Sequence, residues 1–100
     1  MIVGVVRLDL RLYDCHSLKQ KRSVVNRLLQ RLRTKFPVSV AEVGSLDLRQ
    51  RALLGATLVA GEEKLVQSVF AALEKELEYA ADVEIINQDM EILHYGEKLD

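Results

Sequence analysis

The sequence predicts an α+β fold in which two helices cover one face of a four-stranded antiparallel sheet. Three observations predict it: four segments with the two-residue alternation of strands, two segments with helical periodicity, and the order β-α-β-β-α-β. Because crossover connections are right-handed, this order leaves the ferredoxin-like arrangement as the expected topology. A chain of 100 residues suits one domain, which we place at 1–95, followed by a short C-terminal tail at 96–100.

The first strand is expected at residues 2–13 and the first helix at 17–36. Along the strand every charge lies at an odd position, so the even face packs and the odd face is open. Ser17 followed by Gln20 fits a capping box at the start of the helix, and Pro37 ends the helix. The helix carries one apolar stripe at helical spacing, made of Leu18, Val25, Leu28, Leu29, Leu32 and Phe36.

Two further strands follow the first helix. A short strand is expected at residues 38–43, the GSLD segment at 44–47 is typical of a turn, and residues 50–60 alternate as the next strand. In the ferredoxin-like arrangement residues 2–13 and 50–60 are the two central strands.

The remainder of the chain predicts one helix and one strand. The helix begins after Gly61, where glutamates suit the positive end of its dipole. Its predicted buried stripe is Leu65, Val66, Val69, Phe70, Leu73 and Leu77. The last strand covers residues 82–93, and its inward positions change from odd to even, which predicts a bulge near Asn87.

The composition is that of a soluble globular protein, with 49% hydrophobic and 29% charged residues. No apolar run approaches the roughly 20 residues of a membrane span, and the N-terminus lacks the basic region of a signal peptide. We therefore expect no membrane partner. Cys15 is the only cysteine, so we also expect no internal disulfide and a cytoplasmic location. No cluster of histidine and cysteine suggests a metal site, and the sequence implies no cofactor.

The net charge of −1 conceals a strong asymmetry along the chain. Residues through Arg51 include 11 basic and four acidic side chains, whereas residues from Ala52 onward include three basic and 11 acidic ones. One face of the molecule can therefore be basic, and the local field decides whether a polyanion binds.

The first predicted helix carries seven basic residues and no acidic one. Solvent-exposed helices ordinarily mix both signs, so this pattern predicts a helix that binds RNA phosphates. The candidate residues are Lys19, Lys21, Arg22, Arg27, Arg31 and Arg33, extended by Arg49 and Arg51. The alternative is that these cations pair with the acidic second helix through Glu74, Glu76 and Glu78.

The start of the same helix is a possible anion site. His16, Ser17 and Lys21 could hold a phosphate or carboxylate with the free N–H groups of the first turn. Alternatively the Lys21 stem follows the core and its ammonium reaches solvent. His16 has no nucleophile in triad geometry, and Cys15 is either a thiol activated by the helix or a plain buried one. We therefore assign no catalytic residue.

The open sheet face carries few aromatic residues, with only Tyr13 at a strand end, so base stacking there is not expected. A half-apolar face instead suggests contact with a second copy, that is, a homodimer. The arginines near this face could bind phosphates or pair with acidic side chains across the strands. They are Arg7, Arg11, Arg49 and Arg51, opposite Asp9, Glu84, Asp89 and Glu91.

Three segments resemble the YlxP-like family, a small bacterial domain of unknown function, over nearly the whole chain: HSLKQKRSVV (16–25), VSVAEV (38–43) and LRQRALLGATLV (48–59). Family members typically read HSLKEKRSVV, so Gln20 keeps the capping box and removes one acid. The resemblance implies a ferredoxin-like domain whose genes lie beside those for translation initiation and ribosome maturation, and it carries over no established catalytic residue. The matching candidates are Ser17, Leu18, Lys19, Lys21, Arg22, Asp47, Gln50 and Arg51.

The leading hypothesis is a non-enzymatic domain associated with RNA or the ribosome. The alternative is a self-associating module that uses the open sheet face. A third hypothesis is a small enzyme acting on phosphorylated substrates, because acylphosphatases share this fold. Their phosphate-binding loop is rich in glycine, whereas YDCHSLK contains none.

Overall fold

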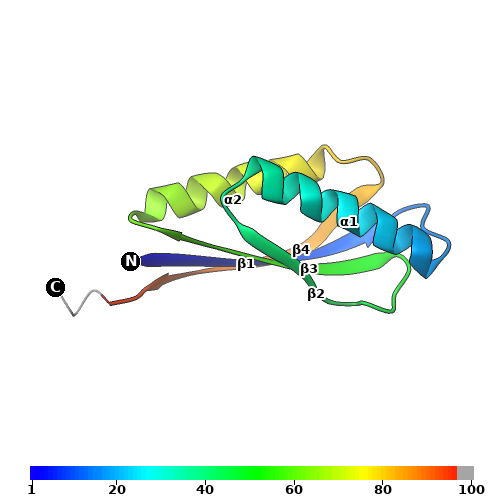
Figure 1. Cartoon of the computed structure of the whole chain (residues 1–100), viewed down its shortest axis with the longest axis horizontal. Helices are drawn as coiled ribbons and strands as arrows, with labels where there is room; N and C mark the ends of the chain where they lie inside the picture. The colour runs from blue at the N-terminus through cyan, green and yellow to red at the C-terminus, as the bar shows by residue number, and fades with distance from the viewer. Residues whose placement is uncertain (97–100) are drawn as a thin grey trace.

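The computed structural model describes residues 1–96 and confirms the predicted α+β, ferredoxin-like fold. The elements are β1 (Ile2–Leu12), α1 (Leu18–Lys35), β2 (Ser39–Gly44), β3 (Arg51–Ala60), α2 (Glu63–Glu78) and β4 (Val83–His94). The strand order is β2-β3-β1-β4, with antiparallel neighbours throughout, and Figure 1 shows both helices on one face of this sheet. Apart from Gly96, the tail predicted at 96–100 lies outside the described residues.

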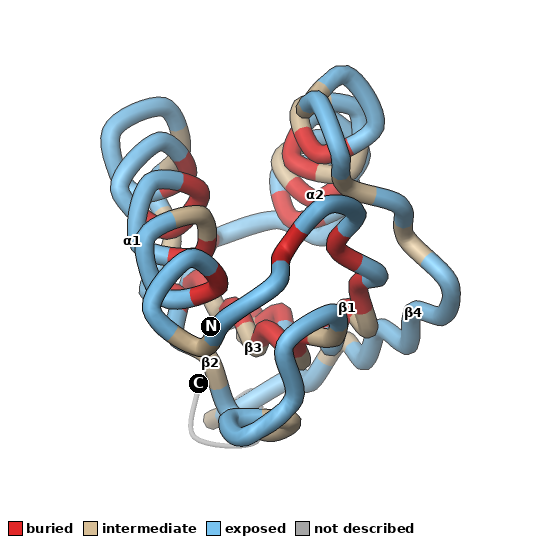
Figure 2. The backbone as a smooth tube through the Cα atoms, turned by 90° about the vertical axis from the view of Figure 1, so that its right-hand side faces the viewer, coloured by how far each residue is buried: buried red, intermediate tan, exposed pale blue. Residues whose placement is uncertain are grey.

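The core lies between the sheet and the two helices, where Figure 2 shows the buried positions gathered. In β1 the even positions from Ile2 to Leu12 are all buried, and the odd positions are exposed or half-buried. The strict alternation arises because only one face of the sheet is covered. The predicted packing face of the first strand is confirmed.

Helix α1 begins with the predicted capping box, except that Gln20 reaches the N–H of His16, one residue before the N-cap. The Ser17 hydroxyl accepts the Gln20 N–H at 3.1 Å, and the Gln20 side-chain oxygen accepts the His16 N–H at 2.7 Å. Phe36 adopts an extended conformation, as expected for a residue that precedes proline, and ends the helix. The apolar stripe of α1 packs on the sheet, with Val25, Leu28, Leu29 and Leu32 buried.

The buried stripe of α2 is narrower than predicted. Val66, Phe70, Leu73 and Leu77 are buried, whereas Leu65 is 50% exposed. The four buried residues recur at i, i+4, i+7 and i+11, and Leu65 lies one position outside that series. The assignment of Leu65 to the core was therefore wrong.

The predicted bulge in β4 is present. Asp9 of β1 faces Asn87 and Leu10 faces Ile85, so Ile86 has no partner in β1. The extra residue reverses which parity points inward along β4. In the described residues no helix is both long enough and apolar enough to cross a bilayer.

Gly4 leaves room for α2 to approach the sheet. A Cβ at this position would overlap Cγ1 of Val66 and lie 2.9 Å from Cε2 of Phe70. Gly4→Ala should therefore lower the free energy of unfolding by about 1–3 kcal/mol, because the helix must shift. Urea denaturation measures the change. Gly61→Ala is the matched control, since nothing lies within 4 Å of its Cβ position, and equal destabilisation of the two variants would contradict the argument.

Candidate nucleic-acid interface

The basic residues of α1 form two rows on opposite sides of the helix. One row contains Lys19, Arg22 and Arg33. This row faces β2, because the Arg33 guanidinium donates to the Val40 carbonyl of β2 at 2.8 Å. We call it the β2-side row. The other row, the α2-side row, contains Arg27, Arg31 and Lys35. The crest between the rows is exposed and uncharged, and its residues are Ser23, Gln30 and Thr34.

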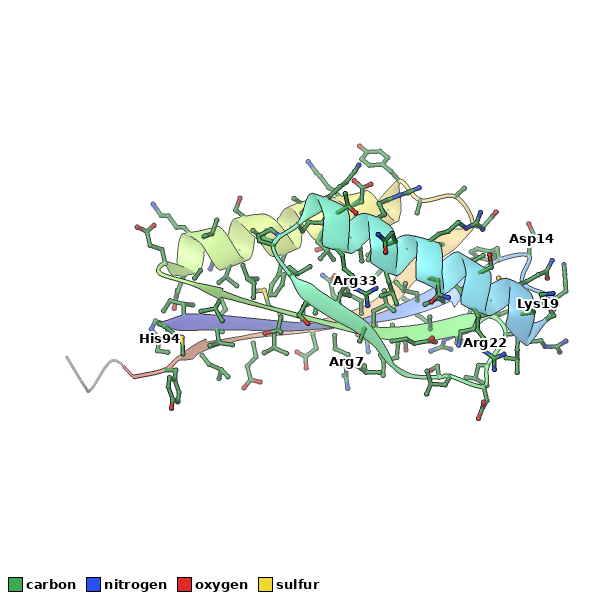
Figure 3. All side chains as sticks on the ribbon, in the orientation of Figure 1. Arg7, Asp14, Lys19, Arg22, Arg33 and His94 are labelled. Atoms are coloured by element: carbon green, nitrogen blue, oxygen red, sulfur yellow. The ribbon has the colours of Figure 1, made fainter. Side chains whose placement is uncertain are left out.

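In the β2-side row Arg33 binds a backbone carbonyl, and the other two cations have no partner in the described part of the chain. Lys19 and Arg22 are exposed and form no ion pair among residues 1–96. Figure 3 shows Lys19 at the start of α1 and Arg22 at the side of the helix above the loop between β2 and β3. These two side chains are free to contact an anion.

The α2-side row is partly neutralised. Glu76 of α2 lies 2.9 Å from the Lys35 ammonium and 4.0 Å from Nε of Arg31. Arg27 has no such partner among the described residues, but it lines a groove of about 390 Å³ that Asp14 and Asp82 also line. The alternative prediction, that the cations of α1 pair with the acids of α2, therefore holds for two cations of this row, and within residues 1–96 Glu76 is the one acid of α2 that pairs with α1.

Lys21 is completely buried, with a relative exposure of 0%. Its ammonium donates to the backbone carbonyls of Ser45 at 2.6 Å and Leu46 at 3.3 Å. It also lies 2.7 Å from Oε2 of Glu42, an ion-pair distance. This oxygen is buried and has no hydrogen-bond partner among the described residues, so its contact with Lys21 is an ion pair.

Both interpretations of Lys21 from the sequence were wrong: the ammonium neither reaches solvent nor is available to a phosphate. Lys21 continues the buried series Val25, Leu28 and Leu32 at helical spacing, which directs its side chain toward the sheet. There the Ser45 and Leu46 carbonyls accept its hydrogen bonds, and the Glu42 carboxylate supplies the opposite charge that a buried ammonium requires.

The anion site predicted from His16, Ser17 and Lys21 does not form. The Ser17 hydroxyl is engaged by the Gln20 N–H, and the backbone N–H of His16 donates to the Gln20 side chain. Lys21 points toward Glu42. The capping box therefore uses groups that would have bound the ion.

Arg49 and Arg51 lie on different surfaces. The Arg49 guanidinium donates to the His16 carbonyl at 3.2 Å, which places it beside the start of α1 and the β2-side row. Arg51 lies on the open sheet face and pairs with Asp9 at 2.7 Å. Of the two, only Arg49 extends the basic surface of α1, and the predicted alternative of pairing across strands is realised for Arg51.

Sequence reasoning missed three residues of this region: Glu42, Leu46 and Leu48. A signal for Glu42 existed, because Val38, Val40 and Glu42 share a parity and Val40 points inward. Glu42 is therefore expected to point inward, as Lys21 of the preceding helix does, and two opposite charges that point into one core predict a buried ion pair. Leu46 and Leu48 belong to the loop and gave no periodic signal.

Cys15 is a buried thiol. Burial raises its pKa, and the carboxylates of Asp14 and Asp82 raise it further. The thiol therefore stays protonated at neutral pH, so the interpretation as a plain buried cysteine is supported over a thiolate activated by the helix. Within residues 1–96, no group of three or more histidine, cysteine, aspartate or glutamate side chains is placed to hold a metal ion.

The open sheet face has an apolar end and a charged end. The strand register places Val59, Val3 and Leu93 side by side across β3, β1 and β4. Val59 and Leu93 are exposed, and Val3 is half-buried. The Arg51–Asp9 pair lies toward the other end, and Figure 3 shows Arg7 projecting from this face away from the helices.

Residues 3–90 match the model of the family described as "Protein of unknown function (DUF503)". The chain belongs to this family. It is also 36% identical over 77 residues to "Uncharacterized protein YlxP" of Bacillus subtilis (strain 168), a match that covers 73% of this chain and 84% of the relative. The resemblance inferred from the sequence segments is thus confirmed.

Removing the Lys21 ammonium should destabilise the fold strongly. Lys21→Met leaves the mostly buried Glu42 carboxylate without its cation and two carbonyls without their donor, so we expect the free energy of unfolding to fall by about 3 kcal/mol. Urea denaturation followed by circular dichroism measures it. Lys19→Met, on the exposed side of the same helix, should change stability by about 0.5 kcal/mol or less. A Lys21→Met variant as stable as this control would refute the assignment.

Proposed function

We propose that this protein is a non-enzymatic, cytoplasmic RNA- or ribosome-associated domain that binds phosphates through the β2-side row of α1 and Arg49. The observation that carries the proposal is the unneutralised charge of this surface. Lys19 and Arg22 have no acidic partner among residues 1–96, and α1 itself contains no acid. The assignment to ribosome maturation or translation rests on the gene neighbourhood that the family resemblance implies.

A net charge near zero does not oppose this function. The acidic side chains concentrate in the second half of the chain, whereas the β2-side row lies at the other side of α1 from Glu76. Opposite charges more than about 8–10 Å apart are largely screened at physiological ionic strength. A phosphate backbone that approaches the β2 side therefore encounters mainly positive charge.

Neutralising the β2-side row should weaken RNA binding and its salt dependence. Lys19→Gln/Arg22→Gln is expected to lower affinity for single-stranded RNA and for ribosomal subunits. The slope of log K against log salt should fall by about 0.7 for each phosphate that the variant no longer neutralises. Fluorescence anisotropy across a salt series measures both quantities.

The matched control for this test is Arg31→Gln/Lys35→Gln, which removes the same charge from the row that contacts Glu76. It should change the slope less than the β2-side variant does. Equal effects of the two variants would contradict the assignment to the β2 side, and a wild-type protein that binds no RNA at low salt would refute the function.

A second candidate function is self-association through the open sheet face. The apolar row of Val59, Val3 and Leu93 favours it, because the helices cover the opposite face and leave this row exposed. A two-fold dimer would bury the row against its own copy. This surface is separate from the β2-side row, so dimerisation and RNA binding are compatible.

Placing a charge in the apolar row should dissociate such a dimer. Val59 is 62% exposed, so Val59→Lys is expected to leave the fold intact and to shift the protein from dimer to monomer, since two buried ammonium groups would face each other. Sedimentation equilibrium measures the mass. Leu65→Lys, on the exposed side of α2, is the control and should remain dimeric. A wild-type monomer at high concentration would exclude this candidate.

A further inference from the structure

The loop between β2 and β3, residues 45–50, exposes two leucines. Leu46 is 56% exposed and Leu48 is 51% exposed, and one aspartate, Asp47, separates them. A single exposed leucine is ordinary on a protein surface, but two on one short loop form an apolar tip. Neither residue contributes to the core, so their place in the loop has no explanation in packing.

The loop is held in one conformation from several sides. The Lys21 ammonium binds the carbonyls of Ser45 and Leu46, and the Ser45 carbonyl also accepts the Leu48 N–H at 3.1 Å. Ser45 has a φ of 59°, a left-handed conformation that is uncommon for residues other than glycine. A completely buried ammonium thus stabilises a strained turn whose side chains point into solvent.

Two contacts fasten the C-terminal half of the loop. Arg49 donates to the His16 carbonyl at 3.2 Å, and the Gln50 carbonyl accepts the Leu12 N–H at 2.9 Å. A surface ordered in advance loses little conformational entropy when it binds a partner. Because these contacts hold the loop in one conformation, little conformational entropy would be lost when the loop binds a partner.

The surroundings of the tip indicate the chemistry of its partner. Arg49 lies in the loop itself, and Figure 3 shows Arg22 on the side of α1 above it. Asp47 has no ion-pair partner among the described residues, so its carboxylate can accept hydrogen bonds from a ligand. Phosphates, apolar ring faces and amino donors occur together in unpaired nucleotides.

We propose that the 45–50 loop contacts the bases of unpaired RNA, with Leu46 and Leu48 packing on exposed base faces and Asp47 accepting from a base amino group. The inference rests on the proposed function and deepens it, since Lys19 and Arg22 then position the backbone beside the loop. In a duplex the base faces are stacked and out of reach, so the preferred ligand is single-stranded or looped RNA.

The experiment measures binding of the full chain to a mixed-sequence single strand, to the duplex form of the same sequence, and to anionic lipid vesicles. The variants Leu46→Ser and Leu48→Ser are made singly and together, with Leu65→Ser as the matched exposed leucine on α2. The double variant should bind the single strand about fivefold more weakly or worse, because the apolar area that the two leucines bury on the bases is lost. Its salt slope should equal that of the wild type, because the cations that meet the phosphates are unchanged.

A measurement on the wild type covers the case in which the variants do not fold. The methyl NMR signals of Leu46 and Leu48 should shift on addition of the single strand, while those of Leu65 stay in place. Unmoved signals in saturating RNA would overturn the loop contact.

The outcomes separate the two proposals. If the wild type binds no RNA, the proposed function fails and the loop inference fails with it. If the wild type binds the single strand but the leucine variants bind equally well, or if the duplex binds as tightly, the loop inference alone is overturned. If the leucines govern binding to vesicles and leave RNA affinity unchanged, the tip is a membrane contact and the inference is likewise overturned.

Discussion

The buried Lys21 ammonium joins three parts of this fold at a single point. It extends from α1, pairs with Glu42 of β2, and binds two carbonyls of the loop that follows. An ammonium removed from water is costly unless acceptors surround it, so this arrangement is stable only when helix, strand and loop are all in place. The interaction therefore sets the position of α1 over the β2 edge and the conformation of the loop together.

The placement of α1 decides which of its charges are available. Arg33 reaches the Val40 carbonyl of β2, and Lys35 reaches Glu76 of α2, so the two rows belong to different surfaces. The crest between the rows is uncharged. Seven cations that look alike in the sequence therefore differ in the structure: Lys19 and Arg22, at the start of α1, form no ion pair within residues 1–96, whereas the α2-side row faces acidic groups.

The three surfaces of the domain are arranged without overlap. Lys19, Arg22 and the 45–50 loop lie at the start of α1, the apolar row lies on the uncovered face of the sheet, and the acids of α2 and β4 lie toward the opposite edge. This separation follows from the strand order, which places the basic first helix over β2 and the acidic β4 at the other edge. The proposed RNA ligand and the proposed second copy of the chain would therefore use different surfaces.

The periodicity and the local capping signals of the sequence by themselves determined the order of the six elements, the packed face of β1, the capping box at Ser17 and the bulge in β4. Each depends on residues a few positions apart, where side-chain direction follows from helix or strand geometry. The same reasoning identified Lys19 and Arg22 as exposed cations. It also placed the Lys21 stem along the core, but it kept Lys21 among the anion-binding candidates because its partners Glu42, Ser45 and Leu46 lie far along the chain.

Only the tertiary structure decided the ion-pair partners of Lys21 and Arg51. It also decided the exposure of Leu46 and Leu48. Lys21 meets Glu42, and Arg51 meets Asp9, across long stretches of chain, so both pairs depend on strand register and on how the helix sits on the sheet. The loop conformation depends in turn on Lys21. Charge counted along the sequence predicts how many cations a helix has, but burial and long-range partners determine which of them remain free to bind.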